Sequence, residues 1–238
     1  MRRYVAIRGT RHPERPFRET GNEKLETAIK VYSYLAMGAL VPLFPLDLVL
    51  FPGTQLPLHI FEERYKEMIG ECLRDKSVFG IVRAKEGGLA EIGCSAEVMG
   101  VTKRYEDGRL DIMVEGKRRF EVMEVNEERS FLQGDVMYFD DEPGSAPHEK
   151  QEHAVELFTQ LIEVIGAEAE APEGDDPFLS FQLVAALPLD LDFKQTLLGM
   201  RSEADRISAI TEYYEALLPR MKRTMRARQR AGGNGHVS

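Results

Sequence analysis

The spacing of apolar and polar positions changes along the chain, and each spacing predicts one kind of element. Residues 41–60 are strongly apolar but are interrupted by four prolines. Proline interrupts helices and cannot donate within a central strand, so this segment is expected to form short extended pieces at sheet edges. Residues 61–76 carry apolar side chains at i, i+4, i+7, i+8 and i+11, which predicts an amphipathic helix.

Strand patterns dominate the next part of the chain. Five segments have the alternation or the apolar composition of strands: 77–84, 96–105, 109–116, 117–125 and 131–139. The Glu-Asp-Gly sequence between the second and the third predicts a tight turn in which Gly108 adopts a positive φ. Residues 41–139 are therefore expected to be mostly antiparallel β-structure with one inserted helix.

The composition changes at residues 140–150, and the apolar period then becomes helical. Asp176 stands before a proline and is expected to cap the start of one helix. Ser202 is expected to cap a later helix. We expect Pro219 to disrupt or end that helix and residues 219–238 to form a basic tail.

The charge is spread unevenly, and this limits the possible partners. Residues 37–218 carry 17 basic and 36 acidic side chains, and a body this acidic repels a phosphate backbone. Residues 219–238 carry six basic and no acidic side chains. This tail could contact nucleic acid or a membrane. We favour a solvated helix end, because the tail has no aromatic residue to stack on bases and positive charge suits a helix C-terminus.

The two cysteines and the apolar runs indicate a compartment. Cys72 and Cys94 form no C-x-x-C pair, so no disulfide framework is expected and a reducing cytoplasm fits. No apolar run reaches the roughly 18–20 residues that cross a bilayer, so we expect no membrane partner and no signal peptide. Residues 1–36 are expected to be a disordered or helical extension, and whether Met1 or Met37 is the true start stays open.

Few residues suggest catalysis or metal binding, and we expect no catalytic residue, metal or cofactor. Cys72 belongs to the apolar stripe and is expected to be buried, whereas Cys94 could be more exposed. His148 and His153 could form a ligand pair on a helix, but a solvated helix start is the favoured interpretation. His59 is expected to be a hydrogen-bonded structural histidine.

Two further features have structural interpretations. Residues 117–119, Lys-Arg-Arg, follow Gly116 but lack the remainder of a phosphate-binding loop, so we expect them at the end of a hairpin. The methionines at 99, 113, 123 and 137 are expected to fill the interior of the β-structure, with an adaptable binding surface as the alternative.

A family resemblance follows from one long string of residues. VPLFPLDLVLFPGTQLPLHIFEERYKEMIGECL, residues 41–73, resembles the opening of the Lon N-terminal domain, especially in small stand-alone bacterial proteins of that type. Three later stretches agree: FGIV at 79–82, GRLDIMVEGKRRFEV at 108–122 and LPLDLDFKQTLLGM at 187–200. The resemblance covers residues 41 to 218 and implies an α+β fold. It would consist of a PUA-like β pseudo-barrel over 37–140 with an inserted helix and a helical bundle over 147–218.

The resemblance also implies a function. In ATP-dependent Lon proteases this domain helps to recognise protein substrates, so we expect a non-enzymatic module that binds unfolded or partly folded polypeptides. A protease or a chaperone would be a further partner. The ATPase activity of Lon is not implied, because the chain has no Walker A loop.

The proline-interrupted segment is the expected binding surface. We expect it to follow the rim of the barrel and to leave an apolar groove partly exposed. The expected peptide-binding residues are Phe44, Phe51, Pro52, Leu58 and Arg118. The alternatives are an RNA-binding protein that uses the basic tail, by analogy with PUA domains, and a hydrolase for which no residue can be nominated.

Overall fold

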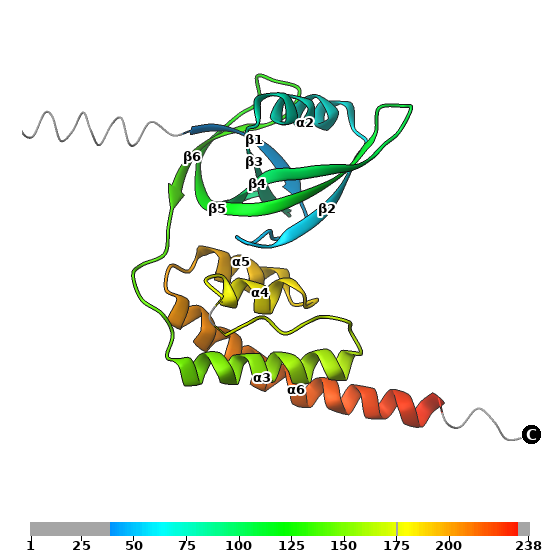
Figure 1. The fold of residues 1–238 in the computed structure, drawn as a ribbon, viewed down its shortest axis with the longest axis vertical. Helices are drawn as coiled ribbons and strands as arrows, with labels where there is room; N and C mark the ends of the chain where they lie inside the picture. Colours follow the sequence, from blue (N-terminus) through cyan, green and yellow to red (C-terminus); the bar gives the residue numbers. More distant parts are fainter. Residues whose placement is uncertain (1–38, 175, 233–238) are drawn as a thin grey trace, which may run out of the picture. The chain divides into compact units, whose positions relative to one another are not determined.

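The computed structural model describes residues 39–174 and 176–232 (Figure 1). The β-part contains β1 (Ala39–Leu46), β2 (Gln55–Ile60), α2 (Glu63–Asp75), β3 (Phe79–Lys85), β4 (Gly88–Arg104), β5 (Leu110–Asn126) and β6 (Gln133–Phe139). The helical part contains α3 (His148–Ile165), α4 (Leu179–Ala185), α5 (Leu191–Gly199) and α6 (Glu203–Gly232). The predictions for residues 1–36, and the choice between Met1 and Met37, lie outside the described residues.

The strands form one mixed sheet whose pairing closes on itself. Their order is β2-β5-β4-β3-β1-β6, and β6 also pairs with β5. Five strands therefore form a ring, and β2 is attached to the ring through β5 alone. Only the β1–β3 pair is parallel among the described strands. The expectation of mostly antiparallel β-structure with one inserted helix is confirmed.

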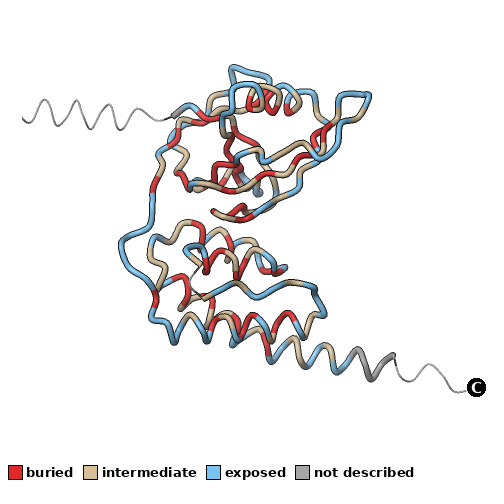
Figure 2. The backbone as a smooth tube through the Cα atoms, viewed as in Figure 1, coloured by how far each residue is buried: buried red, intermediate tan, exposed pale blue. Residues whose placement is uncertain are grey.

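Phe120 fills the interior of the ring and requires two glycines beside it. A Cβ atom at Gly80 or at Gly93 would lie 2.6 Å from the Phe120 ring, so only glycine fits at either position. The other members of this cluster are also buried: Val41, Leu43, Val82 and Val136. The alternation of buried and exposed positions along the strands is visible in Figure 2.

α2 buries the predicted stripe but begins later than expected. Tyr65, Met68, Ile69 and Cys72 are buried, as the helical spacing predicted. The helix begins at Glu63, so Phe61 precedes it and does not share its buried face. The Phe61 side chain is instead 59% exposed.

β5 runs straight through the position where a hairpin end was predicted, and this prediction is wrong. Gly116 does not begin a turn, because its N–H and C=O bond to the loop after β1, at Thr54 O and Gly53 N, both at 2.9 Å. A Cβ at Gly116 would lie 2.1 Å from Phe51 O, so the glycine permits this close crossing. Residues 117–119 therefore lie in the middle of a strand.

The prediction that methionines fill the interior is wrong for three of the four. Met99, Met123 and Met137 are 47–59% exposed, and Met113 is partly buried. Met99 and Met123 fall where the register shifts, between Val98 and Gly100 and between Val122 and Glu124. Strict alternation places Met99 on the face of Glu97 and Met123 on the face of Glu121, so both methionines share the outer faces of their strands with acidic residues.

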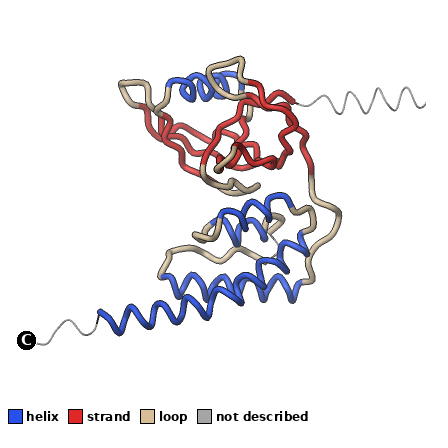
Figure 3. Tube along the Cα trace, turned by 180° about the vertical axis from the view of Figure 1, so that it is seen from behind, coloured by secondary structure: helices blue, strands red, loops and turns tan. Residues whose placement is uncertain are grey.

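α3 and α6 pack side by side, as Figures 1 and 3 show. The predicted cap of α6 is confirmed, because Ser202 Oγ accepts the Asp205 N–H at 3.2 Å. Pro219 was expected to disrupt or end this helix; it does not end it, since α6 continues through Pro219 to Gly232. Leu218 and Met221, on either side of the proline, both pack against the main core, and this burial offsets part of the cost of a proline inside a helix.

Candidate functional site

A groove opens between β1, β2 and the start of α2, and we name it the β1–β2 groove. It is lined by Phe44–Leu46, Pro57–Ile60, Leu132 and four residues around the start of α2: Phe61, Glu62, Arg64 and Tyr65. Its volume is about 620 Å³. Most of its lining is apolar, and the exposed Phe61 ring stands at its margin.

Aromatic rings form one wall of the groove. Phe44 and Tyr65 pack with their ring centroids 4.1 Å apart, and burial raises the pKa of the Tyr65 hydroxyl. The Arg64 guanidinium lies 4.6 Å from the centre of the Tyr65 ring and donates to Glu62 at 2.9 Å from its Nε. The positive charge of Arg64 is therefore already neutralised by Glu62, which lines the same groove.

A short polar chain runs from the groove to the outer face of β5. His59 Nδ1 donates to Asp111 Oδ1 at 2.5 Å, and Tyr105 donates to the other carboxylate oxygen at 2.9 Å. These hydrogen bonds, that from His59 first, hold the pKa of Asp111 below its usual value. His59 also stacks on Phe61, with ring centroids 5.9 Å apart. The expectation of a hydrogen-bonded structural histidine is confirmed.

A second, smaller hollow lies where β5 meets the helical part, and we name it the Arg118 hollow. Its volume is about 200 Å³, and its lining includes Pro52, Arg118, Phe178 and Phe181. Arg118 pairs with Asp140 at 3.1 Å and lies over the Tyr138 ring. Its guanidinium is therefore exposed but partnered.

A buried charge cluster lies behind this hollow. Arg119 donates to Leu198 O at 3.0 Å and to Asp141, and Arg206 donates to the same Asp141 carboxylate. Burial by itself would raise the pKa of Asp141, but Arg206 and Arg119 hold it below its usual value. Glu203 balances the second guanidinium at 2.6 Å. This cluster joins the sheet to α6, and its charges are satisfied internally.

The structure divides the five predicted binding residues between these places. Phe44 and Leu58 line the β1–β2 groove, and Pro52 and Arg118 line the Arg118 hollow. Phe51 has no exposed surface and stacks on Phe181, so the expectation that it lies beside an open groove is incorrect. The close crossing of Gly116 draws this part of the loop into the core.

Sequence reasoning missed Phe61 and the partners of His59. The period of the helix assigned Phe61 to a buried stripe, although Pro57, a few residues earlier, already indicated an edge. Asp111 and Tyr105 come from a distant hairpin, and no local pattern links them to His59. The alternation in β5 placed Asp111 on the polar face, and this was the only available signal.

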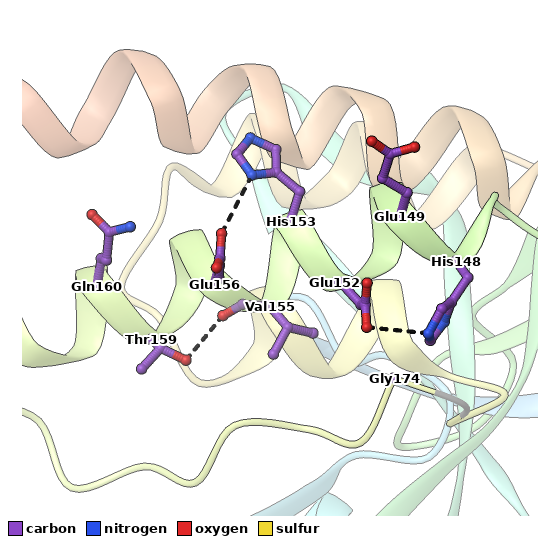
Figure 4. Close-up of a pocket in the computed structure, with 9 residues that line it drawn as sticks. All are labelled: His148, Glu149, Glu152, His153, Val155, Glu156, Thr159, Gln160 and Gly174. Atoms are coloured by element: carbon purple, nitrogen blue, oxygen red, sulfur yellow. Dashed lines mark hydrogen bonds and ion pairs between the residues drawn. The ribbon is translucent and has the colours of Figure 1, made fainter.

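His148 and His153 do not form a metal site. They are five residues apart on α3 and therefore point in different directions, as Figure 4 shows. His148 pairs with Glu152 at 3.2 Å, and His153 pairs with Glu215 at 3.1 Å, all exposed side chains. Within residues 39–174 and 176–232 no three His, Cys, Asp or Glu side chains converge on a metal-binding position.

The two thiols are buried and unpaired. Cys72 lies on the buried face of α2, as predicted, but the suggestion that Cys94 is more exposed is wrong. Burial raises the pKa of Cys94 to about 12, which keeps the thiol protonated and unreactive. No helix in the described part of the chain combines the length and apolarity that a bilayer crossing requires.

Comparison with known proteins identifies the relatives of this chain. The family model of the ATP-dependent protease La (LON) substrate-binding domain matches residues 40–215. The Lon protease of Parabacteroides distasonis is 31% identical over 146 residues, which is 57% of this chain and 18% of that protein. Lon protease 1 of Hydrogenovibrio crunogenus is 25% identical over 200 residues, or 77% of this chain and 24% of that protein. The chain thus spans less than a quarter of either relative.

Two solved structures resemble the fold. A Lon N-terminal domain protein from Xanthomonas campestris matches with a TM-score of 0.61 and 25% identity, covering 74% of this chain and 98% of that one. The N-terminal domain of the Mycobacterium avium complex Lon protease matches with a TM-score of 0.55 and 17% identity over the same shares. The second likeness concerns the fold alone. The family match spans most of the chain, and the chain therefore belongs to the family of the Lon substrate-binding domain.

Proposed function

We propose that this chain is a non-enzymatic module that binds exposed apolar segments of unfolded or partly folded polypeptides in the β1–β2 groove. The observation that carries the proposal is the apolar groove itself, with the Phe61 ring 59% exposed at its margin. A large aromatic side chain left in water is typical of a contact surface. The family's description as a substrate-binding domain supports a polypeptide as the occupant.

Burial of apolar surface would supply most of the binding free energy. It contributes about 25 cal/mol per Å² and is offset by the cost of ordering the peptide. Phe44 and Leu58 would form the floor, and Phe61 would close over the bound segment. Pro52 and Arg118 would belong to a separate contact, since they line the Arg118 hollow. Phe51 would act only by supporting the loop.

The finer assignments belong to the same proposal. The closed ring of strand pairings supports a PUA-like pseudo-barrel, and the packing of α3 against α6 supports a helical bundle after it. The two free cysteines support a reducing cytoplasm, and the bacterial relatives support a bacterial source. It would act as an adaptor that presents polypeptides to a protease or a chaperone.

A direct binding measurement tests the proposal. A fluorescently labelled, permanently unfolded polypeptide is titrated with the protein, and anisotropy reports binding. Phe61→Ser is expected to weaken binding about tenfold, because a buried phenylalanine contributes about 1.5–3 kcal/mol. Met123→Ser is the matched control, since Met123 is also 59% exposed but lies away from the groove. Absence of binding at tens of micromolar, or equal losses in both variants, would contradict the proposal.

RNA binding is the second candidate. Its support is the basic face of α6 beyond Pro219, where Arg220, Lys222, Arg223 and Arg226 are exposed or partly exposed. Its difficulty is the acidic remainder of the chain. RNA retention that disappears when residues 219–238 are deleted would favour this candidate, while retention of polypeptide binding by the same deletion would favour the groove.

A further inference from the structure

We propose that the β1–β2 groove holds its polypeptide as an added β-strand, hydrogen-bonded along the free edge of β2. This inference rests on the proposed function and specifies how that site makes its contacts. Strand addition draws affinity from main-chain hydrogen bonds, while alternate side chains enter the apolar pockets beside the edge. It therefore suits a module that must accept many sequences.

Two unpaired strand edges border the groove. β2 pairs with β5 along Gln55–Ile60, and none of the described strands pairs with its other side. β1 pairs with β3 over Leu43–Leu46, but its pairing with β6 ends at Pro42. The stretch Phe44–Leu46 is thus open on one side, and it lines the same groove as β2. Backbone groups at such edges are available to another chain.

The direction of the β2 backbone groups follows from a neighbouring contact. Thr102, on β4, donates to Asp111 O at 3.1 Å, so this carbonyl is directed toward β4 and away from β2. His59 lies opposite Asp111 in an antiparallel ladder, in which pairs alternate between hydrogen-bonded and not. The His59–Asp111 pair is therefore of the second kind, and the N–H and C=O of His59 face the free edge.

Pro57 supports the same direction. It lies two residues before His59, so its backbone has the same orientation, and it has no N–H to leave unpaired at the edge. Its carbonyl remains available. The edge therefore offers the Pro57 carbonyl and both His59 groups within one short stretch, which limits pairing to a single strand of a few residues.

The side chains around the free edge of β2 determine which sequence pattern a bound segment needs. Leu58 is half-buried and lies on the apolar side of the groove, whereas Pro57 and His59 are exposed. A strand added beside β2 would present every second side chain to Leu58 and Leu46, and the others to solvent. The occupant is thus an extended segment with alternating apolar residues.

The charge of the chain favours a basic occupant. Residues 39–232 carry 23 basic and 36 acidic side chains. Close to the groove the basic side chains are already neutralised, because Arg64 pairs with Glu62 and Lys66 pairs with Glu63, both at 2.8 Å. These pairs neutralise Glu62 and Glu63 equally, so the attraction for positive flanks comes from the net negative charge of residues 39–232 as a whole. We therefore assign an alternating apolar segment flanked by lysine or arginine.

Backbone methylation of a synthetic peptide tests strand addition. Three versions of one lysine-flanked Leu-Thr repeat are compared by anisotropy: unmethylated, N-methylated on the even amides, and N-methylated on the odd amides. Even and odd amides face opposite sides of a strand, so one methylated version should bind as the parent does and the other at least tenfold more weakly. Equal binding by all three would overturn strand addition and leave the proposed function standing. No binding by the parent would overturn the proposed function itself.

The protein offers a matched pair of substitutions. His59→Ala removes only the side chain, whereas His59→Pro also removes the outward N–H without touching the β5 ladder. His59→Pro should bind the parent peptide about tenfold more weakly than His59→Ala, and equal affinities would overturn the assigned edge. Replacing the flanking lysines by glutamate should weaken binding at least tenfold at low salt and less at high salt. Equal binding of both peptides at low salt would overturn the basic occupant.

Discussion

Arg119 of β5 and Arg206 of α6 donate to the same carboxylate, that of Asp141. Both guanidinium groups are almost fully buried, and each also donates to Met200 O, at 2.5 and 2.7 Å. Asp141 therefore links the sheet to the helical part at a point where two positive charges would otherwise repel each other. The arrangement makes this single carboxylate more important to the fold than any exposed ion pair.

Replacing Asp141 by Asn should destabilise the protein by roughly 3 kcal/mol, because it leaves the buried Arg119 guanidinium without a carboxylate partner and Arg206 with Glu203 alone. Asp140→Asn is the matched control. The side chain of Asp140 is 76% exposed and pairs with the exposed Arg118, so its loss should change stability by at most about 1 kcal/mol. The midpoints and slopes of urea unfolding measure both. Equal effects of the two substitutions would contradict the role given to Asp141.

The same carboxylate predicts a pH dependence. The pKa of Asp141 is lower in the folded chain than its usual value of 3.8. Its contribution to stability is therefore complete above that usual value and is lost as the pH falls through the lower, folded pKa. We expect urea midpoints of the wild type to fall below about pH 4. The urea midpoint of Asp141→Asn should fall less steeply at acid pH than that of the wild type. An equally steep fall in the variant would assign the acid transition to other carboxylates.

Asp111 offers a second, local titration beside the groove. Hydrogen bonds from His59 and Tyr105 hold the pKa of Asp111 below its usual value. Breaking the hydrogen bond from His59 should therefore raise this pKa. NMR titration of the Asp111 carboxyl carbon should give a higher midpoint in His59→Ala than in the wild type. Asp107, whose pKa is lowered by Arg109 instead, serves as an internal control and should not move. An unchanged Asp111 midpoint would contradict the hydrogen bond.

Local spacing could predict those elements whose buried face or cap is formed by residues close together in the sequence. The stripe Tyr65–Cys72 and the cap at Ser202 depend only on neighbouring residues, and both are present. The family string added the order of strands and helices. These two sources together predicted the fold class, and the binding surface along residues 41–60 stays a prediction.

The errors have a common physical origin in contacts between distant residues. Gly116 looks like a turn residue, but its role is set by the crossing of Phe51. Met123 is apolar, but it shares a face of β5 with Glu121 and lies at the bulge opposite β6. Phe51 belongs to a proline-interrupted segment that was expected at a sheet edge, yet its ring is buried and stacks on Phe181. No local period contains information about such contacts.

The crossing of the loop over β5 can be tested with a glycine pair. In Gly116→Ala the new Cβ would lie 2.1 Å from Phe51 O, so the loop must move and stability should fall by about 2–3 kcal/mol. Gly100→Ala on β4 is the control, since nothing lies within 4 Å of its Cβ position. That substitution should change stability by less than about 0.5 kcal/mol. Equal urea midpoints for the two variants would contradict the crossing.

The two thiols provide a test of the main hydrophobic core, to which both belong. Cys72 lies on the buried face of α2 and Cys94 on β4, and both are at least 97% buried. Burial also raises the pKa of both thiols, that of Cys94 to about 12, so almost no thiolate exists at pH 8. A disulfide reagent should therefore modify neither cysteine in the native protein at pH 8, and both in urea. The Asp141→Asn variant should expose them at a lower urea concentration than the wild type. Rapid modification of Cys94 in the native protein would show that the ring of strands opens where the structure closes it.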